Sequence, residues 1–74
     1  MDNRFEQVIA VKQRSHRSWN NLYAAACKEL GIEHGFGTLK DERSSVSYLN
    51  TAVKESGMSV TEIKEEIETR NLLR

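Results

Sequence analysis

The chain has 74 residues, of which 11 are basic and 11 are acidic, so its formal net charge is zero. This length predicts one small helical domain over residues 1–74, with a core that supplies only about 3–5 kcal/mol of stability. Its apolar runs are too short for a membrane-spanning helix or a secretory signal, so no membrane partner is expected. The single cysteine, Cys27, cannot form an internal disulfide, which favours a cytoplasmic protein.

The neutral total hides an uneven distribution of charge. From Arg4 to Lys28 there are five basic residues and one acid, whereas from Glu55 to Glu68 there are five acids and one base. A domain dedicated to nucleic acids usually carries excess positive charge, so neutrality argues against that class. The two ends could pair within one molecule, between two copies, or with partners of opposite charge.

Two amphipathic helices are predicted in the first half of the chain. The first has apolar residues at helical spacing from Phe5 onward, and Asn3 and Glu6 have the spacing of a capping box at its start. The second covers residues 18–30 and ends at Gly31, where a left-handed glycine is expected to stop it. Its apolar stripe consists of Trp19, Leu22, Tyr23, Ala26 and Leu30.

The loop over residues 33–38 contains a phenylalanine between two glycines. Because glycine permits positive φ, the backbone can turn sharply on both sides of Phe36. The aromatic side chain either fills a gap over the core, which its size favours, or stays exposed as an anchor for a partner. This Gly-Phe-Gly segment lacks the further glycine and the lysine of phosphate-binding loops, so a nucleotide site is not expected.

A glycine corner joins two further predicted helices, over residues 44–56 and 59–72. Gly57 ends the first of them, and Ser59 with Glu62 starts the second as a capping box. The chain is therefore expected to be all-α, a compact bundle of three to four short helices with a helix-turn-helix-like corner at Gly57. The apolar line of the helix before the corner is expected to consist of Val46, Leu49 and Val53, with Tyr48 and Ala52 beside it.

The spacing around Gly57 resembles a helix-turn-helix, which would imply DNA binding. Val53 and Ile63 match the apolar positions of such a motif, but Ser56 and Glu66 fall where buried apolar residues are expected. The second helix would also present several glutamates to DNA, whose phosphates dominate binding affinity. An ordinary corner between two helices is therefore the favoured interpretation.

A cluster of basic residues near the first turn is the better nucleic-acid candidate. Its cations could contact phosphates, and the neighbouring Trp19 could stack on a base. An aromatic residue at helical spacing more often belongs to the core, so the favoured interpretation is a solvated turn. The candidate nucleic-acid-binding residues are Lys12, Arg14, His16 and Arg17.

Catalysis has little support in the sequence. His16 and His34 are the only histidines, and with Cys27 they have no spacing typical of a metal site. We therefore expect no enzyme, no metal and no other cofactor.

The leading hypothesis is a small non-enzymatic regulatory or adaptor protein that binds another protein through its acidic last helix and the Gly-Phe-Gly loop. An acidic amphipathic helix can lie in the groove of a partner or pair with its own copy, so a homo-oligomer is a further hypothesis. The alternative is a dimeric helix-turn-helix-like transcriptional regulator that binds DNA. The last two leucines are expected to extend past the intramolecular contact. The candidate partner-binding residues are Phe36, Glu62, Glu65, Glu66, Leu72 and Leu73.

Overall fold

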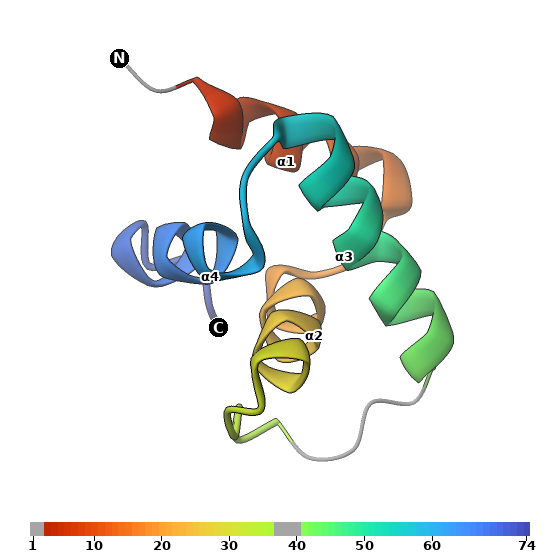
Figure 1. Cartoon of the computed structure of the whole chain (residues 1–74), viewed down its shortest axis with the longest axis vertical. Coiled ribbons are helices and arrows are strands. Elements are labelled where there is room, and N and C mark those ends of the chain that lie inside the picture. The colour runs from red at the N-terminus through yellow and green to blue at the C-terminus, as the bar shows by residue number, and fades with distance from the viewer. Residues whose placement is uncertain (1–2, 37–40) are drawn as a thin grey trace.

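The computed structural model describes residues 3–36 and 41–74 and contains four helices there. They are α1 (Arg4–Ser15), α2 (Trp19–Leu30), α3 (Glu42–Ser56) and α4 (Val60–Thr69). Helix α1 packs mainly on α3, while α2 packs on both α3 and α4 (Figure 1). The described residues include no strand, which confirms the predicted all-α bundle. None of the described helices is long and apolar enough to cross a lipid bilayer.

The hydrophobic core receives large side chains from all four helices. Burying each such side chain contributes about 1.5–3 kcal/mol, so the packing between helices supplies most of their stability. Each helix depends on its neighbours for the burial of its apolar face. The largest apolar side chains that are fully buried are Phe5, Val8, Leu22, Leu49, Ile63 and Ile67.

The ends of α1 and α2 illustrate how local sequence sets helix boundaries. Gly31 adopts φ 71° after α2, and the Ile32 N–H donates to the Cys27 carbonyl at 2.8 Å. This hydrogen bond confirms the predicted Schellman motif. The predicted capping box between Asn3 and Glu6 does not form, because the Asn3 backbone (φ −100°, ψ 7°) is outside the extended conformation of such caps and its side chain makes no capping hydrogen bond.

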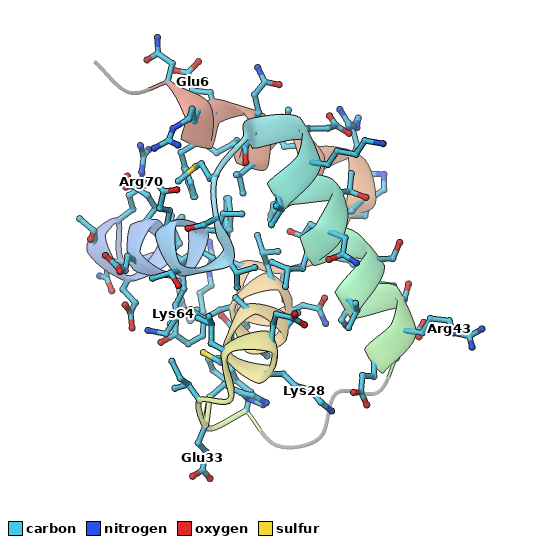
Figure 2. All side chains as sticks on the ribbon, in the orientation of Figure 1. Glu6, Lys28, Glu33, Arg43, Lys64 and Arg70 are labelled. Carbon is cyan, nitrogen blue, oxygen red and sulfur yellow. The ribbon has the colours of Figure 1, made fainter. Side chains whose placement is uncertain are left out.

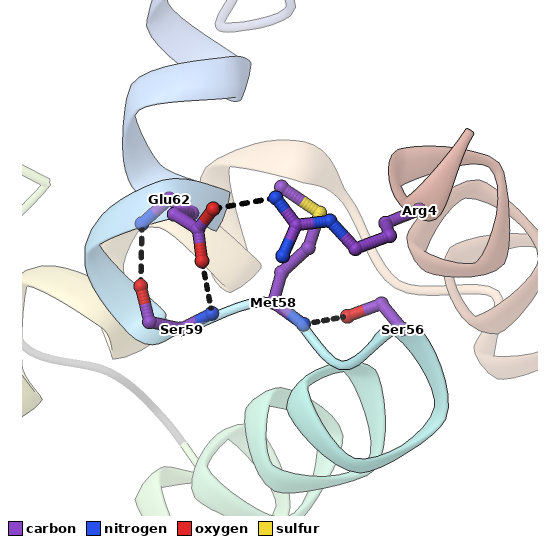
Figure 3. Close-up of polar contacts among 5 residues, drawn as sticks. All are labelled: Arg4, Ser56, Met58, Ser59 and Glu62. Carbon is purple, nitrogen blue, oxygen red and sulfur yellow. Dashed lines mark hydrogen bonds and ion pairs between the residues drawn. The ribbon is translucent and has the colours of Figure 1, made fainter. Parts of the chain in front are cut away.

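The corner between α3 and α4 has the predicted structure (Figure 3). Gly57 adopts φ 74°, and its N–H donates to the Val53 carbonyl at 3.0 Å. The Ser59 hydroxyl accepts from the Glu62 N–H at 3.1 Å, while the Glu62 carboxylate accepts from the Ser59 N–H at 3.0 Å. Both halves of the capping box are therefore present.

Helix α3 buries Tyr48, Leu49 and Ala52 as predicted, but the rest of its buried face differs from the prediction. Val46 and Val53 are only half-buried, whereas Ser45 and Ser56 are buried beside Leu49. The two serines can be buried because their hydroxyl groups are satisfied. Ser45 donates to the Asp41 carbonyl at 3.0 Å and accepts from the Asn21 amide at 3.0 Å, and Ser56 donates to the Ala52 carbonyl at 2.6 Å.

The last helix is shorter than predicted and ends at Thr69. Asn71 takes a left-handed conformation (φ 55°), and the Leu72 N–H donates to the Ile67 carbonyl at 3.1 Å. This turn brings Leu72 and Leu73 back against the core, where both are half-buried. The expectation that these leucines extend past the intramolecular contact is therefore wrong.

Candidate protein-binding surface

Three large apolar side chains are exposed in the described parts of the chain, and all three come from one segment. They are Leu30, Ile32 and Phe36, with exposed fractions of 37%, 46% and 40%. They lie at the end of α2 and in the loop that follows, and we call them the apolar patch. Single exposed apolar residues are common on protein surfaces, and an interaction site needs several of them together.

Phe36 is held at the surface by aromatic neighbours. Its ring meets the Tyr23 ring edge-on at a centroid distance of 6.1 Å and stacks on the His34 ring at 5.9 Å. The Phe36 N–H also donates to Nδ1 of His34 at 3.0 Å, across Gly35, which adopts φ 81°. The favoured prediction that Phe36 fills a gap over the core is therefore wrong, whereas exposure agrees with its alternative role as an anchor. Gly37, the second glycine of the loop, lies outside the described residues.

A polar network fixes the Tyr23 ring on which Phe36 rests. The Tyr23 hydroxyl donates to the Glu68 carboxylate at 2.7 Å, and Lys64 pairs with the same carboxylate at 3.0 Å while lying 5.5 Å from the centre of the Tyr23 ring. The hydrogen bond between Tyr23 and Glu68 is the main reason that the pKa of Tyr23 rises to about 12. It is also the main reason that the pKa of Glu68 falls below its usual value, with Lys64 adding to the effect. The network thus links α2 to α4 beneath the patch.

The glutamates of α4 are mostly neutralised within the molecule. Glu62 pairs with Arg4 at 2.6 Å (Figure 3), and Glu66 pairs with Arg70 at 3.6 Å. The pKa of Glu62 is lowered first by the Ser59 N–H and then by Arg4. These pairings leave less free negative charge on α4 for a partner than the sequence predicts.

Glu65 differs from the other candidate glutamates, because it forms no ion pair with any residue that the structure describes. It is exposed and lines a shallow depression of about 220 Å³ together with Met58, Glu62, Glu66 and Thr69. Among the glutamates predicted to bind a partner, Glu65 is the one whose charge stays available.

The basic side chains of the predicted cluster contact three different residues. Lys12 lies 5.9 Å from the centre of the Trp19 ring, Arg14 pairs with Glu55 at 2.7 Å, and Arg17 binds the Ser44 hydroxyl. His16 is exposed at the left-handed end of α1 (φ 59°). One face of Trp19 is occupied by Phe5, whose ring stacks on it at 5.5 Å. The four predicted residues therefore do not present one uninterrupted basic surface.

The apolar patch contains residues whose exposure the sequence did not reveal. Leu30 was the last member of a predicted core stripe, and Ile32 was the apolar residue of a Schellman motif. The signal that could have found them is their position at the end of α2, because a stripe that outlasts the packed part of its helix ends in exposed side chains.

A metal centre is not among the sites that the structure offers in residues 3–36 and 41–74, since no three His, Cys, Asp or Glu side chains are grouped there to hold an ion. Burial raises the pKa of the Cys27 thiol, which lies beside Tyr23, so Cys27 is held as a neutral thiol.

No protein-family model matches the sequence, and no curated protein or solved structure is significantly similar to it.

Proposed function

We propose that this protein is a small non-enzymatic regulator or adaptor that binds another protein through the apolar patch. The observation that carries this proposal is the exposure of Leu30, Ile32 and Phe36 in one segment. A few apolar or aromatic anchors supply most of the binding energy in protein interfaces. The Phe36 ring is already ordered by Tyr23 and His34, so binding loses little of its conformational freedom.

The charges near the patch indicate the chemistry of the partner. Glu29 and Glu33 are exposed in the same segment and form no ion pair with the described residues, whereas Lys28 is already paired with Glu42 at 2.5 Å. Charge complementarity speeds association and selects among partners. The partner that fits best presents apolar side chains bordered by lysine or arginine.

The test is a binding assay that compares two variants, each of which adds one negative charge at a different position. Immobilised protein is used to capture partners from an extract of its own cells, and the captured protein is then purified for titration. Phe36→Glu should abolish binding, because it puts a carboxylate in the centre of the patch. Asn50→Glu adds the same charge at an exposed position of α3 and should leave binding unchanged. Equal binding by both variants would refute the proposal.

A second pair of variants tests the contribution of α4. Glu65→Lys removes its available carboxylate without breaking an ion pair within the described structure. If α4 contacts the partner, this variant weakens binding and Thr61→Lys, at another exposed position of the same helix, does not. Equal affinity of Glu65→Lys and the original protein would remove α4 from the interface and leave the apolar patch as the binding surface.

Self-association through the patch is measured separately. The mass in solution is determined over a range of protein concentrations, at low and at high salt. A dimer that Phe36→Glu dissociates would identify a second copy as the occupant of the patch. A monomer at all concentrations directs the search to a different protein.

A further inference from the structure

A second surface feature is a polar hollow between the end of α1 and the first half of α3. Its volume is about 330 Å³, room for on the order of ten water molecules. Its lining contains two arginines and five hydroxyl-bearing side chains but no carboxylate. The lining residues are Val11, Arg14, Ser15, Arg17, Ser44, Ser47, Tyr48 and Thr51.

One group in this lining has an unmet hydrogen-bonding requirement. Tyr48 is 4% exposed, and its buried hydroxyl has no hydrogen-bond partner among the described residues. Buried polar groups in folded proteins almost always have a partner, so an exception calls for a ligand or an ordered water. Burial raises the pKa of Tyr48 to about 12, while the nearby Ser15 hydroxyl, which approaches without completing a hydrogen bond, and the Arg17 charge both lower it. The unpartnered hydroxyl therefore lies close to a cation of the same hollow.

Two further hydroxyl groups can donate to a ligand in the hollow. Ser44 accepts a hydrogen bond from Arg17, so its own proton stays available. Ser47 is exposed and lines the same hollow, so its hydroxyl can be reached by a ligand. Together with Tyr48, these groups form a set of donors next to two guanidinium groups, and such a set suits a ligand that only accepts hydrogen bonds.

Both arginines contact carboxylates in ion pairs at the protein surface. Arg14 pairs with Glu55 at 2.7 Å and Arg17 approaches Asp41 at 3.9 Å, and neither acid belongs to the lining. Ion pairs exposed to solvent contribute little energy, so a ligand that binds both cations can replace them. Planar guanidinium groups match the oxygens of a phosphate through paired hydrogen bonds.

We propose that this hollow is a binding site for a phosphate monoester, with Arg14 and Arg17 contacting the phosphate oxygens and the Tyr48 hydroxyl donating to one of them. The monoester is favoured over the diester of a nucleic-acid backbone because two arginines and several hydroxyl groups line the same open hollow. A diester offers fewer charged oxygens to such a set. This site differs from the apolar patch in its residues and in its ligand.

The experiment titrates the full chain with methyl phosphate and follows its backbone amide resonances by NMR, with sodium chloride matching the ionic strength. Saturable shifts are expected at residues 14–17 and 44–51. Arg17→Gln should weaken binding about tenfold, and Tyr48→Phe should weaken it about threefold. Arg43→Gln is the matched control, because it removes the same charge as Arg17→Gln from a residue outside the lining. Arg43 lies at the start of α3 and extends away from the body of the molecule (Figure 2).

Three outcomes would overturn the proposal. Shifts that do not saturate, or that sodium chloride reproduces, would show an effect of ionic strength alone. Equal losses for Arg17→Gln and Arg43→Gln would show diffuse attraction to surface charge. Tighter binding of dimethyl phosphate than of methyl phosphate would assign the hollow to a nucleic-acid backbone. A folded-protein spectrum from each variant ensures that a loss of binding is not a loss of structure.

Discussion

The unpartnered hydroxyl of Tyr48 makes a specific prediction about stability. Tyr48→Phe removes one oxygen and leaves the ring, which is buried in the core, unchanged. Leaving a buried polar group without a partner costs about 1–3 kcal/mol, so its removal should stabilise the protein by about 1 kcal/mol in a buffer without phosphate. For a domain of this size, that change raises Tm by about 4–8 °C.

Tyr23→Phe is the matched control, because the same atom is removed from a hydroxyl that has a partner. The Tyr23 hydroxyl donates to Glu68 at 2.7 Å, so this substitution should lower the free energy of unfolding. Urea titrations of the two variants and the original protein measure both effects at pH 7. Destabilisation by both substitutions would show that the Tyr48 hydroxyl is paired in solution, and the reasoning about the hollow would lose its main observation.

Three further predictions concern the corner between α3 and α4. Ser59→Ala removes the hydroxyl that accepts from the Glu62 N–H, so urea titration should show a loss of about 1 kcal/mol. Gly57→Ala should cost about 1–2 kcal/mol in the same assay, entirely from the positive φ, because no atom lies within 4 Å of the added Cβ. The pKa of Glu62 is lowered in the folded protein, so its contribution to stability is present above its ordinary pKa of 4.5 and is lost as the pH falls below that value. Glu62→Gln should therefore reduce the dependence of Tm on pH between pH 3 and 5, as measured by circular dichroism; an unchanged dependence would contradict this assignment.

The helix boundaries that the sequence predicted are those set by a few neighbouring residues. Gly57 with Ser59 and Glu62 forms the expected corner, because a left-handed stop and a capping box need only local hydrogen bonds. The same holds for Gly31 at the end of α2. Asn3 fails for a local reason as well, since its backbone does not take the conformation that a cap requires.

The buried face of α3 could be predicted from apolar spacing only in part. Ser45 occupies the core because Asn21, from another helix, donates to its hydroxyl, and this partner is 24 positions away in the sequence. Hydrophobic periodicity treats serine as polar and therefore places Val46 inward. The partners of the charged residues depend on tertiary structure in the same way, as the pairing of Arg14 with Glu55 shows.

The apolar patch was only half predictable. The glycines around Phe36 correctly indicated a turn, but sequence alone left open whether the ring faces the core or the solvent. The choice depends on whether the core has room. Ile63 and Ile67 occupy the core, and Phe36 packs edge-on against the ring of Tyr23 instead.

The uneven charge of the chain has a structural consequence for binding. Arg4 of the basic first third pairs with Glu62 of the acidic last third, and Arg14 pairs with Glu55, so much of the opposite charge meets within one molecule. Exposed ion pairs of this kind contribute little to stability, but they reduce the long-range field that would otherwise attract any highly charged partner. Specific binding must then come from local features with defined geometry. The apolar patch and the polar hollow are two such features, and they favour different chemistry, an apolar segment of a protein and a phosphate group.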